Sequence, residues 1–377
     1  MKLADLTTLR VGGEAEHILA PADSRELVDV VREVWATGDD WLLLGGGSNV
    51  VIGDEGFDGT VVRVVTRGIE RLPAAAAALR PSAYVRERTV RLQVQAGEAW
   101  DDVVASTVAN GWAGIEALSG IPGSAGAAPI QNIGAYGQEI GSSLVGVEFL
   151  DYQTGELARI PASELGLGYR TSVLKQGRVG LVVSIELELS EAAPGARSLS
   201  QPIAYAQLAA ALGVRIGDRV PLDEVRRAVL ALRASKGMLW DERDPDSISA
   251  GSFFTNPIVT ENFARRLQAD APRWPTASVE PDLVVPLGET PAVPRVAGEY
   301  RVKLSAAWLI EKAGISRGFS LPGSHAAISS KHTLAIVNRG GASAADVLEL
   351  ARYVQTRVFA EFGVRLHIEP VLVGIQL

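Results

Sequence analysis

The sequence predicts a multidomain protein that combines α/β and α+β architecture, and three observations carry this prediction. The chain has 377 residues, more than one hydrophobic core usually organises. Its first half alternates helical and strand-like segments, which is typical of α/β folds. The stretch 190–202 is rich in Ser, Pro and Gly, so we expect a domain boundary there.

The first half is expected to contain one clear helix and a series of strands. Residues 23–38 predict the helix because their apolar side chains share one face, namely Leu27, Val30, Val31, Val34 and Trp35. Asp23 with Glu26 indicates a capping box, and Gly38 is the expected stop. Alternating or buried apolar patterns predict strands over 41–44, 60–65, 90–95, 144–152 and 181–189.

The second half is expected to be helical around a long loop. Apolar spacing predicts helices over 221–237, 305–314 and 343–363. Residues 272–299 hold many prolines and are interpreted as loop, while the low-complexity stretch 72–88 is interpreted as an exposed insertion. Residues 364–374 predict a final strand with Val364, Leu366 and Ile368 on one face and Arg365, His367 and Glu369 on the other.

Composition excludes several classes of function. Lys plus Arg is 36 and Asp plus Glu is 44, a net charge of −8, which argues against a general nucleic-acid binder but not against a small anionic substrate. Without cysteine, disulfides, thiolate catalysis and cysteine–metal sites are excluded, and four histidines without an HxxxH pair predict no metal site. No apolar run has the length of a signal peptide or a spanning helix, so we expect a cytoplasmic protein without membrane contact.

Two glycine-rich segments are candidate ligand loops. Residues 45–49, Gly-Gly-Gly-Ser-Asn, follow a predicted strand, where consecutive N–H groups can bind an anion; a simple tight turn is the alternative. A Rossmann site is disfavoured because turn and strand follow rather than a helix. Residues 119–137 hold five glycines, two prolines and four alanines, so their backbone can lie along an extended ligand. Gln131 and Asn132 offer polar groups there.

The remaining candidates are isolated polar residues in short motifs, and each has a plain structural alternative. Arg170 and Lys175 flank Ser172, where either could be a surface cation. Four more residues fall in one later region: Arg233, Lys236, Ser252 and Asn256. Ser252 is a candidate proton donor or a turn cap, and since no histidine lies near it in the sequence, a hydrolase-type nucleophile is not expected. Glu369 could be an ordinary solvated carboxylate.

Together these segments resemble the UDP-N-acetylenolpyruvoylglucosamine reductases. The matching segments occur in the family's order, at 7–13, 45–49, 121–137, 169–175, 250–257, 306–314 and 367–374. The insertion over 72–88 and the tract before Tyr205 depart from compact members, but neither touches a matching motif. Tyr205 stands where the loop-bearing type I members carry a substrate-closing tyrosine.

The resemblance implies a fold of three domains. Residues 1–66 and 67–220 would be the two lobes of an FAD-binding fold of the vanillyl-alcohol-oxidase (PCMH) type. Residues 221–356 would form an α+β substrate-binding domain. Residues 357–377 would return to the FAD-binding lobes and carry Glu369 there. A monomer is expected.

The resemblance also implies an enzyme that uses FAD and NADPH to reduce the enolpyruvyl ether of UDP-N-acetylglucosamine to UDP-N-acetylmuramate, a step of peptidoglycan synthesis on which cell shape and division depend. Arg170 would clamp the substrate carboxylate, protonated Glu369 would hydrogen-bond the enolate, and Ser252 would give the final proton. Substrate contacts would come from Tyr169, Tyr205, Arg233, Lys236 and Asn256. Cofactor contacts would come from Gly45, Gly46, Gly47, Ser48, Asn49, Ser119, Gly120, Ile121, Pro122, Gly123, Ser124, Gly126, Asn132, Gly134, Ala135, Tyr136 and Gly137.

Two other functions stay open on the sequence. One is an FAD-dependent oxidase of the same fold that passes electrons to oxygen and acts on a small alcohol or sugar. The other is a nucleotide-binding module without chemistry. Measuring oxygen uptake and NADPH oxidation separates the oxidase from a reductase. Any turnover excludes the nucleotide-binding module.

Overall fold

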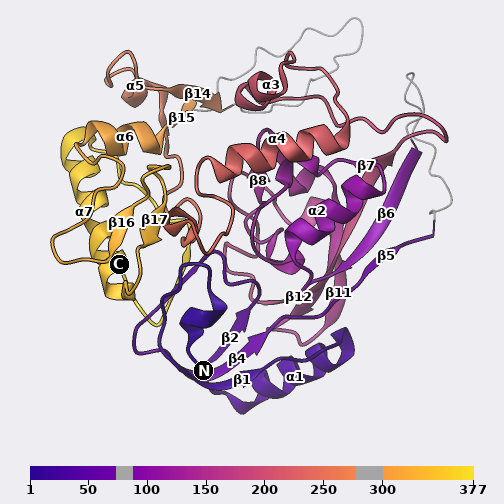
Figure 1. Cartoon of the computed structure of the whole chain (residues 1–377). Helices are drawn as coiled ribbons and strands as arrows, with labels where there is room; N and C mark the ends of the chain where they lie inside the picture. The colour runs from indigo at the N-terminus through magenta and orange to yellow at the C-terminus, as the bar shows by residue number, and fades with distance from the viewer. Residues whose placement is uncertain (74–87, 277–299) are drawn as a thin grey trace, which may run out of the picture.

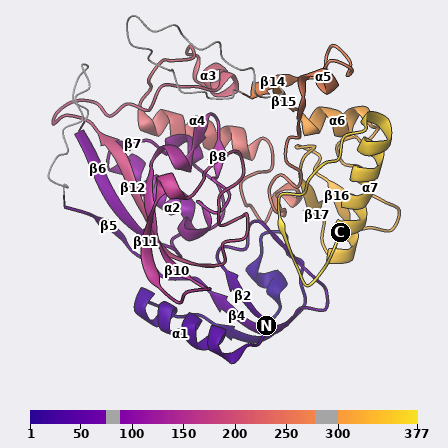
Figure 2. The same ribbon diagram turned by 180° about the vertical axis from the view of Figure 1, so that it is seen from behind.

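A computed structural model describes residues 1–73, 88–276 and 300–377 of the chain. Figure 1 and Figure 2 show the C-terminal helices α6 (Ala306–Lys312) and α7 (Ala344–Phe362) at the end of the molecule away from strands β5 (Ile69–Arg71) and β6 (Arg88–Gln95). Among the described residues, none of the helices is both long and apolar enough to cross a membrane.

The N-terminal part is a small parallel sheet with one helix. Its strands have the order β1-β4-β2 and the bounds Ala15–Leu19 (β1), Phe57–Arg63 (β4) and Trp41–Leu44 (β2). Helix α1 (Ser24–Thr37) begins where the Asp23 carboxylate accepts the N–H groups of Arg25 and Glu26 and ends at Gly38 with φ 78°. The prediction of a capping box is wrong in one detail, because the Glu26 side chain accepts the N–H of Ala22 rather than that of Asp23.

The largest sheet is antiparallel, and its central strand contributes side chains to two hydrophobic cores. Its order is β11-β10-β12-β6-β5, with β7 added beside β12. The bounds not yet given are Trp112–Ala113 (β7), Leu144–Asp151 (β10), Leu157–Pro161 (β11) and Gly180–Glu191 (β12). Val182 packs in one core with Trp100 of helix α2 (Trp100–Ala109), whereas its neighbours Leu181 and Val183 pack in another with α1. Alternating side chains of one strand thus join two cores.

The C-terminal part combines short sheets with helices. Helices α3 (Ala206–Leu212) and α4 (Leu222–Ala234) come first. A three-stranded antiparallel sheet of order β13-β15-β14 follows, with bounds Ile258–Thr260 (β13), Arg273–Thr276 (β14) and Arg301–Leu304 (β15), and α5 covers Glu261–Ala264. The hairpin β16 (Ala326–Ile328) and β17 (Ile336–Asn338) packs against α7, which begins at the expected capping box of Ser343 and Asp346.

The two ends of the described chain meet. Strand β18 (Val371–Val373) pairs in parallel with β3 (Val50–Ile52), immediately after the first glycine loop. The largest core likewise contains Val51 beside Phe253 and Val354. The N-terminal loops and the C-terminal part therefore share one packed interior.

Two sequence predictions are corrected. The final strand covers only 371–373 rather than 364–374, since Pro370 has no N–H for a ladder, although Val364 and Leu366 are buried as expected. Strand β14 occupies part of the stretch interpreted as loop, and its Pro275 is tolerated because β14 is an edge strand. Tyr205 lies in the irregular segment directly before helix α3, which consists of the strong helix formers Ala, Leu and Gln.

Two further expectations fall outside the described residues. They are the interior of the insertion, residues 74–87, and residues 277–299 of the proline-rich stretch. The strand expected over 60–65 begins and ends earlier, at Phe57–Arg63.

Helix α7 is joined to the N-terminal part by one carboxylate. Asp54 accepts the N–H groups of Ala344 (2.7 Å) and Ala345 (3.0 Å) at the first turn of α7. We expect Asp54→Ala to lower the free energy of unfolding by about 1 kcal/mol, because helix N-terminal donors lose their acceptor. Asp58→Ala, at an exposed position of the same region, should change it by less than about 0.5 kcal/mol. Urea unfolding of both variants measures the difference; equal effects would contradict the cap.

Candidate active site

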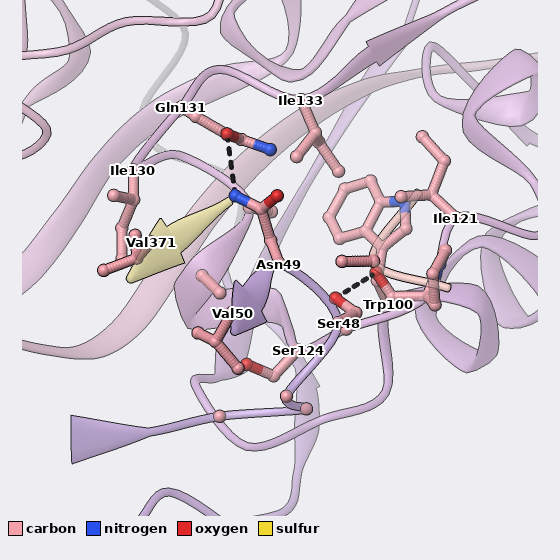
Figure 3. Close-up of a pocket in the computed structure, with 18 of the residues that line it drawn as sticks. Ser48, Asn49, Val50, Trp100, Ile121, Ser124, Ile130, Gln131, Ile133 and Val371 are labelled. Atoms are coloured by element: carbon pink, nitrogen blue, oxygen red, sulfur yellow. Dashed lines mark hydrogen bonds between the residues drawn. The ribbon is translucent and has the colours of Figure 1, made fainter. Parts of the chain in front are cut away.

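A cavity of about 460 Å³ lies where the two glycine loops meet the C-terminal part. This volume falls within the usual range for small-molecule sites. Figure 3 shows Ser48 and Asn49 on one loop facing Gln131 and Ile121 on the other, with Val371 of β18 alongside. The predicted site residues that line it are Gly45, Gly46, Gly47, Ser48, Asn49, Ile121, Pro122, Gly123, Ser124, Gly134, Arg170, Arg233, Ser252 and Glu369.

The other predicted residues lie outside the lining. They are Ser119, Gly120, Gly126, Asn132, Ala135, Tyr136, Gly137, Tyr169, Tyr205, Lys236 and Asn256. Several of them build the loop instead. A Cβ on Gly126 would meet the Ala96 Cβ at 2.5 Å, and the Asn132 amide bridges Glu139 and Gly168. These residues shape the cavity wall without facing the cavity.

Glycine in the two loops permits backbone-to-backbone contact. A Cβ on Gly46 would lie 2.6 Å from the Gly123 Cα, and one on Gly123 would lie 2.6 Å from the Ser48 Oγ. Gly123 also has φ 112°, a region that other residues rarely adopt. Glycine is therefore required at these positions, because only then can the two loops contact each other at the cavity wall.

The same loops present backbone donors without internal partners. Six N–H groups donate no hydrogen bond within the described part of the chain, those of Gly46, Gly47, Ser48, Asn49, Gly123 and Ser124. Buried or half-buried N–H groups are almost always paired. A converging set of free donors is the backbone arrangement that binds an anion such as a diphosphate.

Glu369 is buried at the far side of the cavity among cationic and amide groups. Its carboxylate lies 3.2 Å from the Arg170 Nε and accepts from the Gln131 Nε2 at 3.2 Å. The Glu369 side chain is only 11% exposed. Arg170 has a positive φ of 53° and donates to the Gly134 carbonyl, which fixes the direction of the guanidinium. A solvated carboxylate at this position is excluded.

Burial is the main influence on the pKa of Glu369. Burial raises the pKa of its carboxyl, and the opposing effects of Arg170, Lys175 and Gln131 do not cancel that rise. Desolvation penalises the charged form of an acid, and nearby cations favour it. Burial likewise lowers the pKa of Lys175. The pKa values of both groups are thus shifted towards neutrality from the usual values of a glutamate and a lysine.

Gln131 and Lys175, which the sequence offered as polar candidates without a specific role, both line the cavity. The Gln131 Oε1 accepts from the Asn49 Nδ2 (3.0 Å) and from the Lys175 Nζ (3.1 Å). Lys175 also reaches the Glu369 carbonyl at 3.4 Å. The signal available in the sequence was their position beside predicted residues, which does not tell which side chain of a loop turns inward.

Ser252 has a histidine partner, contrary to expectation. Its Oγ lies 3.3 Å from the Nε2 of His332, which is 80 positions away in the sequence and so left no local signal. The Glu369 N–H donates to the carbonyl of Phe253 at 2.9 Å. This backbone bond holds Ser252 and Glu369 at the same cavity.

Arg233, Lys236 and two tyrosines form a group beside the cavity. Arg233 is buried and donates to the carbonyls of Gly120 and Met238, and burial lowers its pKa to about 10. The Lys236 Nζ lies 5.4 Å from the centre of the Tyr136 ring, and the rings of Tyr136 and Tyr205 are 5.9 Å apart, edge to face. Tyr205 is 47% exposed, so this group borders solvent.

Tyr169 and Asn256 lie together at another point of the periphery. Burial raises the pKa of the Tyr169 hydroxyl, which the neighbouring Asn256 partly opposes, and the Asn256 Oδ1 accepts the N–H of Ala306 at the start of α6. The Lys303 Nζ lies 4.7 Å above the Tyr169 ring. Lys303 was not predicted, because a lone lysine in a short strand carries no distinguishing pattern.

Comparison with known families supports the predicted fold class in both halves. A family model described as an FAD binding domain matches residues 15–161. A second, described as the C-terminal domain of UDP-N-acetylenolpyruvoylglucosamine reductase, matches residues 244–373. The predicted combination of an FAD-binding fold with a separate C-terminal α+β part is confirmed.

Whole-chain similarity agrees with these matches. The UDP-N-acetylenolpyruvoylglucosamine reductase of Leifsonia xyli subsp. xyli is 63% identical over 383 residues, covering 100% of this chain and 98% of the relative. That of Saccharopolyspora erythraea is 48% identical over 375 residues, covering 100% and 95%. The crystal structure of the Thermus caldophilus enzyme matches with a TM-score of 0.59 and 26% identity, over 99% of this chain and 97% of that one. The chain therefore belongs to the UDP-N-acetylenolpyruvoylglucosamine reductase family.

Proposed function

We infer that the chain is an NADPH-dependent flavoprotein oxidoreductase that reduces the enolpyruvyl ether of UDP-N-acetylglucosamine to UDP-N-acetylmuramate in peptidoglycan synthesis. Membership of the reductase family over the whole chain supports this function. The observation that carries it is the convergence of Arg170, Ser252 and Glu369, from three distant segments, on one cavity. An oxidase or a module without chemistry explains neither the C-terminal match nor this convergence.

The cavity wall fits FAD. The free N–H groups of the glycine loops suit its diphosphate, and Trp100, Ile121 and Ile133 offer apolar surface for a flat ring. When bound, FAD takes hydride from NADPH and delivers it to the substrate alkene. Residues of both glycine loops would hold the cofactor, with Ser48 and Asn49 among the cavity-facing side chains.

Arg170 and Glu369 would act as a pair on the substrate carboxylate. A carboxylate that approaches Arg170 must share the guanidinium with Glu369, which lies 3.2 Å away. Two carboxylates on one cation are repulsive unless one is protonated, and burial already raises the pKa of Glu369. Protonated Glu369 would then donate a hydrogen bond to the developing enolate.

Ser252 would supply the proton that completes the product. Its hydroxyl lines the cavity on the segment that the Glu369 N–H bonds. The serine O–H bond would break as the new C–H bond forms on the second carbon of the enolpyruvyl group. A serine is a weak acid in water, but an enolate carbon is a strong base, so the transfer is feasible.

The peripheral groups would hold the UDP-sugar. Lys236 and Tyr205 border solvent beside the cavity and suit a diphosphate and a sugar face. Arg233 lines the cavity while two of its five N–H groups donate to backbone carbonyls, so it would act on the substrate by its charge and its remaining donors. Tyr169 and Asn256 would contact the substrate or the nicotinamide from the other side. The domain boundaries, a monomeric state, a cytoplasmic location and a role in cell shape and division are part of the same proposal.

The cofactor provides the first test. The protein should be yellow, release free FAD on denaturation, lose its visible absorbance with NADPH, and regain it with the enolpyruvyl UDP-sugar but only slowly with oxygen. The non-covalent link is expected because the chain has no cysteine and its four histidines lie outside both glycine loops. Stopped-flow absorbance measures both half-reactions. Rapid reoxidation by oxygen with no response to the UDP-sugar would identify an oxidase instead.

Replacement of Ser252 should separate the two half-reactions. Ser252→Ala should leave flavin reduction by NADPH near the wild-type rate, since that step needs no proton on the substrate. Reoxidation by the enolpyruvyl substrate should fall by about 10²–10⁴-fold or more, the usual share of a general acid. Ser163→Ala, at an exposed position, is the matched control. An equal loss in both half-reactions would make Ser252 structural.

Glu369 should act through its protonated form. Reoxidation by substrate should slow as pH rises through the raised pKa of Glu369, because the hydrogen-bond donor is lost on deprotonation. Glu369→Gln keeps a donor that does not titrate, so it should retain activity and lose this pH dependence. Glu369→Ala should be slower by about 10²–10³-fold, as for a lost oxyanion donor.

The measurement for Glu369 is the reoxidation rate from low to high pH. Glu349→Gln, at an exposed position of α7, is the control. An Ala variant as fast as the wild type, or a Gln variant with an unchanged pH profile, would remove Glu369 from this role.

A further inference from the structure

Ser252 and His332 are held together by more than their side chains. The Ser252 Oγ lies 3.3 Å from the His332 Nε2. On the next residue, the Phe253 N–H donates to the carbonyl of Leu334 at 2.7 Å. The serine segment and the turn between β16 and β17 are thus also joined through the backbone, which keeps Ser252 and His332 close together.

The turn that carries His332 is itself rigidly supported. The buried Ser329 Oγ accepts the N–H groups of Lys331 (3.1 Å) and His332 (3.2 Å). Asp246 accepts both the N–H (2.7 Å) and the hydroxyl (2.6 Å) of Ser330. Such supporting hydrogen bonds keep a functional side chain within the narrow tolerance that a proton transfer needs.

The direction of the Ser252 proton depends on which partner donates. A hydroxyl has one proton and two acceptor positions. If the imidazole accepts, the serine proton points at His332 and away from the cavity. If the Nε2–H donates, the serine proton is free to turn towards the cavity that Ser252 lines. Only the second arrangement leaves Ser252 ready to protonate a ligand.

We propose that His332 is a positioning residue whose Nε2–H donates to the Ser252 Oγ and directs the serine proton into the cavity. The proposal rests on the function inferred above. As the Ser252 O–H bond breaks and the substrate C–H bond forms, the same Nε2–H stabilises the negative oxygen. A water molecule then returns a proton to Ser252, and His332 keeps its own proton throughout.

The surroundings of His332 keep its ring neutral. Burial lowers its pKa to about 4, and the positive charges of Lys236, Arg317 and Arg233 act in the same direction. At neutral pH the imidazole therefore carries a single proton that can be used for donation. The same cations disfavour an extra proton on His332 but favour negative charge on the neighbouring Ser252 oxygen, as a serine acid requires.

The test compares two replacements of His332. His332→Gln retains an N–H donor, whereas His332→Leu removes it at similar volume. We expect His332→Leu to slow reoxidation by the enolpyruvyl substrate by about 10²-fold, as for a lost donor to a developing oxyanion, and His332→Gln to stay within about 10-fold of the wild type. In both variants flavin reduction by NADPH and the KM for the UDP-sugar should be unchanged. His325→Leu, at an exposed position, is the matched control.

A second measurement reports the tautomer directly. The chain has four histidines, so ¹⁵N spectra of histidine-labelled protein can be assigned by single replacements. We expect His332 to show a protonated Nε2 from pH 6 to 8. A protonated Nδ1, or His332→Leu reoxidised at the wild-type rate, would overturn the proposal, and the spectra remain decisive if that variant does not fold. Failure of the wild type itself to react with the UDP-sugar would instead overturn the proposed function.

Discussion

The parallel pairing of β18 with β3 is the constraint on which the rest of the site depends. It joins residues 371–373 to residues 50–52, directly beside the first glycine loop. Two residues before β18 stands Glu369, whose carbonyl and carboxylate meet Asn49, Gln131 and Lys175. Without this pairing, the glycine loops would have no acidic group opposite them, and Arg170 would lack its partner.

A second consequence of the arrangement is electrostatic. The cavity places two cations around one buried carboxylate, and the hydrogen bonds of Gln131 together with the ion pair of Arg170 connect them. Removing charges from solvent is costly, so such a group persists only when each member has a partner. In the proposed function, an incoming substrate carboxylate would change that balance and favour proton uptake by Glu369.

Elements whose whole pattern lies within one segment could be predicted from the sequence. Helix α1 with its Asp23 cap and helix α7 with its Ser343 box have local patterns, and both lie where expected. The glycine loops were also identified, because few other functions need so many small residues in order. Their contacts were less predictable: Gly126 and Asn132 support the loop from within rather than facing the cavity.

What the sequence could not supply was proximity between distant segments. His332 lies beside Ser252 through the packing of a hairpin turn, and no spacing rule links two residues so far apart. Gln131 and Lys175 reach the site because their loops turn inward, which is decided by tertiary contacts. Strand β14 illustrates the same limit, since its proline-rich sequence is acceptable only at the edge of a sheet.

The pairing of β3 with β18 also has a consequence for biosynthesis. Translation proceeds from the N-terminus, so both glycine loops leave the ribosome long before residues 369–373 do. Until then the cavity lacks one wall, and the exposed edge of β3 has no partner strand. The complete cofactor site therefore forms only after residues 369–373 have been synthesised, whereas the N-terminal sheet can begin to fold before then.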